Sequence, residues 1–263
     1  MLARAPPGPE YTARQMHFDS RPFELHCAAH SDIGRMRRRN EDHYVCDATL
    51  RLLAIADGMG GHAAGDVASR LAVQTLCDRL HGEPDSPCTP SARLRAAIET
   101  ANIAIHLAAA DSQQLGMGTT IVTAWFVDGA VLVAHVGDSR LYRLRGDELV
   151  ALTRDHSWVQ DMIDRGLYTP ERARTSPRRN QLLRALGSLP DVEIDLAMHA
   201  LRAGDRYLLC SDGLNGMLDD AEIAALLGAD ATPQSRVQRL IDSANARGGR
   251  DNVTVAIADV LER

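Results

Sequence analysis

Residues 52–62 of the chain read L-L-A-I-A-D-G-M-G-G-H. A short apolar run that ends in an acid and then glycines is typical of a buried strand that delivers a carboxylate to the edge of a cavity. The glycines after Asp57 let the backbone turn sharply and leave room for a ligand to approach. Because Asp-Gly is also the commonest hairpin turn, this stretch alone does not distinguish a site from a turn.

A second copy of this arrangement lies far downstream. Residues 207–213 read Y-L-L-C-S-D-G and place Asp212 before a glycine, while Asp251 directly precedes another strand-like run and Asp138 follows one. Together with Asp57, these acids could converge from four strand ends on one cavity. Clustered carboxylates bind hard cations such as Mg²⁺ through oxygen, so the sequence predicts a metal site.

The composition indicates a folded protein that does not bind nucleic acid. The chain of 263 residues is 45% hydrophobic and 24% charged, which suffices for the core of one large domain. Its net charge of -6 lacks the basic excess of a general nucleic-acid binder. All 29 basic side chains are arginines, so a Walker-type phosphate loop and Schiff-base chemistry, which need lysine, are excluded.

The cysteines and apolar runs indicate a cytoplasmic protein. Five cysteines form an odd number without a C-x-x-C pair, so a reducing compartment fits better than a disulfide framework or a zinc site. No apolar run approaches the roughly 20 residues of a membrane span. The start of the chain also lacks the apolar stretch of a secretory signal. We expect no membrane partner and a monomer.

The pattern along the chain predicts an arm followed by one domain. Residues 1–21, rich in proline, glycine and small residues, indicate a flexible N-terminal arm, and residues 22–263 form the domain. Apolar residues at steps of three and four predict helices over 65–80, 92–110 (capped by Ser91), 220–227 and 232–247. Adjacent hairpins over 118–152 favour an antiparallel sheet, with further strands over 23–30, 43–47, 51–56, 192–198, 206–211 and 252–260. The polar segment at about 154–190 is expected to be a mobile flap.

Eight stretches carry a family resemblance. They are S-D-I-G-R-M-R-R-R-N-E-D (31–42), D-G-M-G-G-H-A-A-G (57–65), G-M-G-T-T (116–120), G-D-S-R-L-Y-R-L-R (137–145), L-T-R-D-H-S (152–157), R-A-L-G (184–187), C-S-D-G-L (210–214) and G-G-R-D-N-V-T (248–254). In this order they resemble the metal-dependent serine/threonine protein phosphatases of type 2C, in their compact bacterial form. The resemblance implies an α+β fold, a four-layer α/β/β/α sandwich of two stacked antiparallel sheets flanked by antiparallel helices.

The resemblance also implies a reaction and its metal ligands. The reaction is hydrolysis of phosphoserine and phosphothreonine monoesters by in-line attack of a metal-activated water, with two ions of Mg²⁺ or Mn²⁺. Asp57 would bridge the two ions, with the Gly58 carbonyl completing one side. Asp212 and Asp251 would hold the second ion, and Asp138 together with Asp212 resembles the pair that holds a third, weaker ion in bacterial members.

Other residues receive roles by resemblance. Arg37 matches the arginine that clamps the substrate phosphate. Asp42 resembles an outer-shell acid, with Glu41 beside it. His62 is a candidate proton donor, although in relatives with a shorter turn the histidine directly follows Asp-Gly. The proton could therefore come from His62, from a metal-bound water, or from neither.

Residues outside the catalytic motifs are expected to be structural or to differ from relatives. His156 is expected to hold the start of the flap, whereas His135 and the remaining histidines outside the motifs should have packing or surface roles. Many bacterial relatives have His-Pro before the R-A-L-G motif, where this chain has Ser176-Pro177. That difference could alter substrate handling without removing a metal ligand.

Two other functions fit parts of the sequence. A two-metal nuclease would use the same acids but should carry a basic groove, which the net charge of -6 opposes. A catalytically silent phosphoprotein-binding module on the same fold should lack one of the acids, and every expected acid is present. We expect phosphorylated proteins as substrates and a bacterial serine/threonine kinase as the opposing partner.

Overall fold

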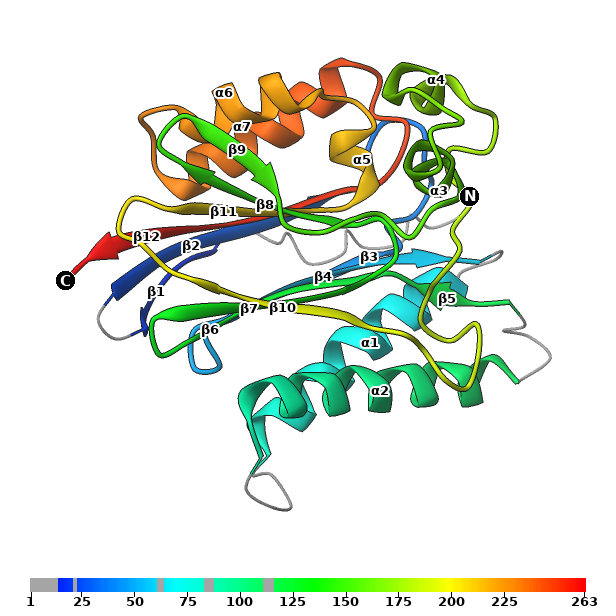
Figure 1. The fold of residues 1–263 in the computed structure, drawn as a ribbon, viewed down its shortest axis with the longest axis horizontal. Helices are drawn as coiled ribbons and strands as arrows, with labels where there is room; N and C mark the ends of the chain where they lie inside the picture. The colour runs from blue at the N-terminus through cyan, green and yellow to red at the C-terminus, as the bar shows by residue number, and fades with distance from the viewer. Residues whose placement is uncertain (1–13, 21–22, 61–63, 83–87, 111–115) are drawn as a thin grey trace, which may run out of the picture.

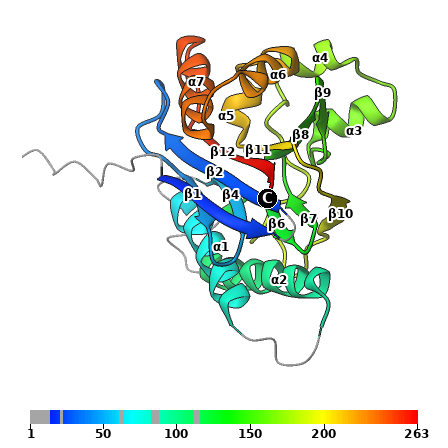
Figure 2. The ribbon, with the colours of Figure 1, turned by 90° about the vertical axis from the view of Figure 1, so that its left-hand side faces the viewer.

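The computed structural model describes residues 14–20, 23–60, 64–82, 88–110 and 116–263. Two antiparallel sheets stack face to face between two helical layers (Figure 1). Helices α1 (Ala64–His81) and α2 (Pro90–Ala109) cover one sheet, and α6 (Asp220–Gly228) and α7 (Pro233–Ala246) cover the other. The same layers are seen from the side in Figure 2. The predicted four-layer α/β/β/α sandwich is confirmed.

The sheet beneath α6 and α7 has the strand order β1-β2-β12-β11-β8-β9. Its strands are β1 (Arg14–Ser20), β2 (Phe23–Asp32), β8 (Arg140–Arg145), β9 (Glu148–Ala151), β11 (Arg206–Cys210) and β12 (Val253–Glu262). Strand β1 corrects the expected arm, because Arg14–Ser20 pairs with β2 as the edge strand. The alternation of Met16 and Phe18 is the strand signal that the proline-rich residues before it obscure. Residues 1–13 lie outside the described part.

The second sheet has the order β10-β7-β6-β4-β3, with β5 paired to β4. Its strands are β3 (Asp42–Asp47), β4 (Leu52–Met59), β5 (Gly118–Thr119), β6 (Ile121–Val127), β7 (Ala130–Val136) and β10 (Asp195–Ala200). In β4, Leu53 and Ile55 pack into the core between the sheets, and the alternate residues pack towards α1 and α2. Because side chains alternate along a strand, Asp57 continues the inward row at the end of the inter-sheet space.

Short polar residues begin most of the helices. The Thr89 hydroxyl accepts a hydrogen bond from the Ala92 N–H, and Pro90 occupies the first turn of α2. The cap is therefore Thr89 and not the predicted Ser91, because Pro90 is already helical. Asp219 and Glu222 form a reciprocal capping box at the start of α6.

The segment expected as a flap contains two short helices, α3 (Trp158–Asp164) and α4 (Pro170–Thr175). Ser157 and Thr169 cap them through their hydroxyls. These helices lie at the same end of the sandwich as α5 (Asp212–Asn215), the helix that directly follows β11 (Figure 1). Among the helices of the described residues, none is long and apolar enough to cross a membrane.

Candidate metal centre

Five aspartates from both sheets gather at the end of the sandwich near α5. They are Asp42 at the start of β3, Asp57 in β4, Asp138 between β7 and β8, Asp212 at the start of α5 and Asp251 just before β12. Burial raises the pKa of Asp57, and the charges of the other four acids all raise it further, so the five form one electrostatic cluster. The structure thus places the predicted acids together.

Asp42 and Asp57 lie directly opposite each other in the antiparallel pair β3–β4. Both side chains therefore share the inter-sheet face, although like charges in this position destabilise a sheet. One Asp42 oxygen, Oδ2, accepts hydrogen bonds from Ser211 Oγ at 2.8 Å and from Thr254 Oγ1 at 2.7 Å. Ser211 directly follows β11 and Thr254 lies in β12, so both hydroxyls come from the other sheet. Its second oxygen, Oδ1, is buried without a hydrogen-bond partner among the described residues. Burial raises the pKa of Asp42 to about 6, against the effect of the two hydroxyls.

Two threonines of the G-M-G-T-T stretch fix the backbone of Asp57. Its N–H donates to Thr120 Oγ1 at 3.0 Å, and its carbonyl accepts from Thr119 Oγ1 and from the Thr120 N–H, both at 2.9 Å. The Thr120 hydroxyl also lies 2.7 Å from Ser139 Oγ. Thr120 therefore ties the strand carrying Asp57 to the loop carrying Asp138.

Asp138 sits where the chain crosses from β7 of one sheet to β8 of the other. The preceding Gly137 has φ of 107°, and a Cβ there would lie 2.6 Å from Thr120 Cγ2, so the crossing requires glycine. Burial raises the pKa of Asp138 to about 7, and the nearby charge of Asp155 adds to the rise. An ionised Asp138 is thus disfavoured unless a cation is close.

Asn252 joins the loop of Arg37 to the loop of Asp251. Its Nδ2 donates to the carbonyls of Ile33 and Arg39, both at 2.9 Å, and its Oδ1 accepts from the Glu41 N–H at 2.9 Å. The Arg37 Nη2 donates to Asp251 Oδ2 at 2.6 Å, and this bond raises the pKa of Arg37. A half-exposed guanidinium therefore lies at the edge of the carboxylate cluster.

The electrostatics of the cluster fit hard cations. Burial first, and then the neighbouring carboxylates, hold the pKa of Asp57 and of Asp212 well above the ordinary range. A divalent cation would reverse this shift and supply a partner for the free Asp42 oxygen. Among the described residues, no three of the five acids have oxygens within 4.8 Å of one another. Opposite ligands of one Mg²⁺ ion lie only about 4 Å apart, so three of these acids do not bind one ion directly in this arrangement.

Gly58 lies at a close approach of backbones and not at a turn. Strand β4 runs on to Met59, and the Gly58 N–H donates to the Glu41 carbonyl at 3.1 Å. A Cβ on Gly58 would lie 2.2 Å from the Gly65 carbonyl oxygen and 2.5 Å from that of Glu41. The predicted need for glycine therefore has a different cause, because it is protein backbone that occupies the space.

Several residues that shape the site were not predicted from the sequence. Asn252, Thr120, Ser211 and Thr254 all lie inside the motif stretches, and that membership was their only signal. The predicted proton donor His62 lies outside the described residues. The backbone of Glu41 forms hydrogen bonds with Gly58 and Asn252 at the site. Burial raises the pKa of its side chain.

Comparison with known proteins agrees with this geometry. A family model described as Protein phosphatase 2C matches residues 37–248. The chain belongs to the protein phosphatase 2C family.

Relatives in the phosphatase 2C family cover most of the chain. The serine/threonine protein phosphatase PstP of Mycobacterium tuberculosis is 44% identical over 239 residues, which are 90% of this chain and 45% of PstP. This chain therefore spans about half the length of that relative. The serine/threonine phosphatase stp of Listeria innocua is 39% identical over 89% of this chain and 96% of its own length.

A solved structure of the family shows the same fold with metal. The catalytic domain of PstP in complex with two manganese ions is 43% identical, with a TM-score of 0.82 over 90% of this chain and 98% of that chain. Manganese in that relative agrees with the donor set seen here, in which the acids offer only oxygen ligands.

A histidine pair that was not predicted from the sequence lies next to the Asp138 loop of this phosphatase 2C fold. His135 and His156 stack with ring centroids 4.5 Å apart, and ligand atoms of both rings and of Asp195 lie within 4.8 Å of one another. Stacked rings 22° from parallel do not direct two lone pairs at one ion. Arg184 also forms an ion pair with Asp195, with 2.8 Å between Nη1 and Oδ1, so the group is a poor cation site.

The histidine pair instead anchors the Asp138 loop to the start of the flap, as expected for His156. The Nδ1 atom of His156 accepts a hydrogen bond from the Gly137 N–H at 3.2 Å, and the His156 backbone N–H donates to the Gly137 carbonyl at 2.9 Å. His135 Nε2 donates to the Arg154 carbonyl at 2.9 Å. Burial, followed by the charges of His135 and Arg184, lowers the pKa of His156 to about 4.

The contacts of Gly58 predict the effect of adding one methyl group. Gly58→Ala should lower the free energy of unfolding by about 1–3 kcal/mol, because the Cβ forces the Glu41 or Gly65 backbone away. Gly82→Ala is the control, since a Cβ there meets its nearest atom at 3.5 Å. Urea unfolding of both variants measures the difference, and equal stabilities would contradict the close approach.

The buried His156 predicts a pH dependence. The unfolded chain takes up a proton near pH 6.5 and the folded protein only near pH 4, so stability is full above pH 6.5 and falls as the pH drops. The expected contribution of His156 to this loss is about 3 kcal/mol, and the His156→Gln protein should lack that contribution. Urea unfolding of both proteins in EDTA from pH 7 to pH 4 measures their difference. A difference that is constant with pH would contradict a neutral, buried His156.

Proposed function

We propose that the protein is a metal-dependent protein-serine/threonine phosphatase that hydrolyses phosphoserine and phosphothreonine in other proteins. The observation that carries the proposal is the cluster of five aspartates, in which Asp57 and Asp212 have raised pKa values and Arg37 lies alongside. The phosphatase names of the relatives support the same reaction. A silent phosphoprotein-binding module is less favoured, because it would not need to keep every acid.

We assign the metal ligands as follows. Asp57 would serve two ions of Mg²⁺ or Mn²⁺, with the Gly58 carbonyl on one of them and Asp212 and Asp251 on the other. Asp138, with Asp212, would hold a third ion. When bound, such ions activate a water for in-line attack and neutralise charge on the phosphoryl oxygens.

The chain's own residues orient the reactants. Arg37 binds phosphate oxygens through a planar guanidinium, which suits bidentate contact. Its bond to Asp251 keeps this guanidinium beside the ligands before substrate arrives. Asp42, whose Oδ1 has no hydrogen-bond partner among the described residues, is suited to orient a water at the edge of the centre. His62 remains a candidate donor for the leaving alkoxide.

The cellular setting belongs to the same proposal. The five cysteines are unpaired, which favours a reducing cytoplasm. One chain supplies all the acids of the site, so a monomer suffices for catalysis. A bacterial serine/threonine kinase is the expected source of the phosphorylated substrates.

Hydrolysis of a phosphothreonine peptide tests the proposal. Release of phosphate should require Mn²⁺, stop with EDTA, and fall about 100-fold or more in Asp57→Asn and Asp212→Asn, because each removes a negative ligand. Asp47→Asn is the matched control, since Asp47 lies at the other end of strand β3 from Asp42. Hydrolysis that survives EDTA, or cleavage of single-stranded DNA in place of the peptide, would contradict it.

A further inference from the structure

A cleft of about 650 Å³ leads from the carboxylate cluster to the flap segment. Asp138, Asp212 and Asp251 lie along one part of it, and Arg174 and Arg179 of the flap line another. A peptide that lies along this cleft with its phosphate at the carboxylate cluster would pass these arginines. The charges that line the cleft should then influence which sequences bind.

The seven arginines between residues 154 and 184 divide into two groups. Five are engaged: Arg154 with Asp164, Arg165 with Asp161, Arg184 with Asp195 and Glu193, Arg172 over the Tyr168 ring at 4.0 Å and Arg178 over the Trp158 ring at 5.0 Å. Arg174 and Arg179 make no side-chain hydrogen bond or ion pair within the described ranges, and both are exposed. These two are the ones that line the cleft.

A third arginine of this kind also lines the cleft. Arg250 directly precedes the ligand Asp251, is exposed, and likewise has no ion pair with any residue that the structure describes. Three guanidiniums without a side-chain hydrogen bond or ion pair among the described residues thus line one cleft, although they come from two separate segments of the chain.

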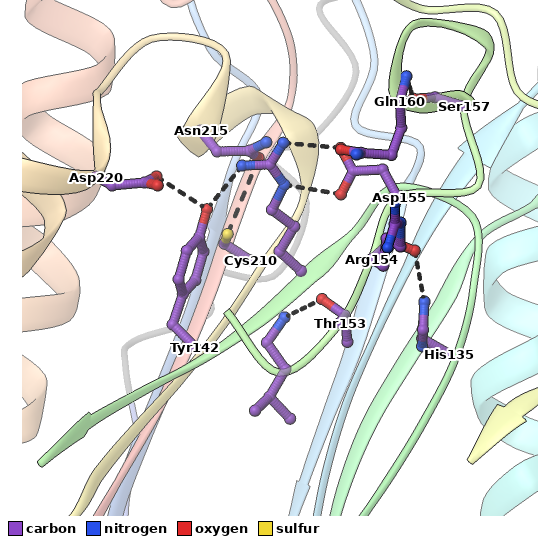
Figure 3. Close-up of polar contacts among 12 residues, drawn as sticks. His135, Tyr142, Thr153, Arg154, Asp155, Ser157, Gln160, Cys210, Asn215 and Asp220 are labelled. Atoms are coloured by element: carbon purple, nitrogen blue, oxygen red, sulfur yellow. Dashed lines mark hydrogen bonds and ion pairs between the residues drawn. The ribbon is translucent and has the colours of Figure 1, made fainter. Parts of the chain in front are cut away.

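Most other charges along the cleft are already engaged within the protein. Asp155 accepts two hydrogen bonds from Arg140, both at 2.8 Å, and Asp220 accepts one from the Tyr142 hydroxyl at 3.3 Å (Figure 3). Arg247 is paired with Glu222, and the Asp219 carboxylate caps α6. If cations neutralise the three ligand acids, three carboxylates and five guanidiniums remain along the cleft, so its net charge is positive.

We propose that Arg174, Arg179 and Arg250 form an anion subsite for a second negative group on the substrate. That group is an oxyanion, either an acidic side chain or a second phosphate, within a few residues of the phosphate that is hydrolysed. Guanidinium groups bind both kinds of oxyanion in bidentate geometry, and a cleft strengthens the attraction by excluding water. The inference rests on the proposed phosphatase function and deepens it.

Three phosphothreonine peptides test the subsite. They are identical except that the flanking positions carry glutamine, glutamate or a second phosphothreonine. The wild type should favour the two anionic peptides through a lower KM, and each of Arg174→Gln, Arg179→Gln and Arg250→Gln should reduce that preference about 2- to 5-fold. The preference should also weaken as NaCl is raised. Comparison of the last two peptides identifies the carboxylate or the phosphate as the better ligand.

Binding provides a readout that does not depend on turnover. Fluorescence anisotropy with the wild-type protein in Mn²⁺ and with non-hydrolysable phosphonate analogues of the peptides should give tighter binding of the glutamate analogue than of the glutamine analogue. Arg172→Gln and Arg178→Gln are matched controls, because they remove equal charge from the same segment outside the cleft, and they should keep the preference.

Failure of the subsite and failure of the proposed function give different results. Metal-dependent hydrolysis of all three peptides at equal efficiency would overturn the subsite and leave the phosphatase. An equal loss of preference in the control variants would also overturn it, because net charge alone would then explain the effect. No hydrolysis of any peptide would overturn the phosphatase and the subsite with it.

Discussion

The repulsion between carboxylates held in the inter-sheet space is the constraint on which the rest of the site depends. Asp42 and Asp57 oppose each other on adjacent strands, and three more acids approach from the other strand ends. Without a cation, burial and mutual repulsion favour the protonated forms of Asp57 and Asp212. The fold therefore maintains an arrangement that is unfavourable in the free protein, and bound cations would relieve it.

Both sheets contribute to holding this arrangement. Ser211 and Thr254 reach Asp42 from the opposite sheet, and Thr120 links the strand of Asp57 to the loop of Asp138. Asn252 holds the Arg37 loop through hydrogen bonds to backbone carbonyls, and His156 holds Gly137 by accepting a hydrogen bond from its N–H. Because these contacts are buried side chain and backbone bonds, the acids are positioned before any ligand binds. Such preorganisation is what a centre that stabilises charge in a transition state requires.

Most of the strands and helices, and the acids, could be predicted from the sequence because their signals are local, whereas the four-layer sandwich was implied by the family resemblance. Apolar runs that end in Asp-Gly marked Asp57 and Asp212, and helical periodicity marked the four covering helices. The contacts that position the acids could not be predicted, because a threonine or asparagine in a motif does not reveal its partner 200 residues away. The histidine pair was missed for the same reason, since His135 and His156 lie on different elements. The edge strand β1 was missed because the composition of the first 21 residues outweighed a short alternation.

Counting bound Mn²⁺ tests the central claim most directly. Electron paramagnetic resonance of free Mn²⁺, measured during titration of the EDTA-stripped protein, gives the number of ions bound per chain. The account predicts at least two ions in the wild type, a reduced number or a much weaker affinity in Asp57→Asn, and unchanged binding in Asp47→Asn. Binding of no more than one ion, or binding that is the same in all three proteins, would contradict it.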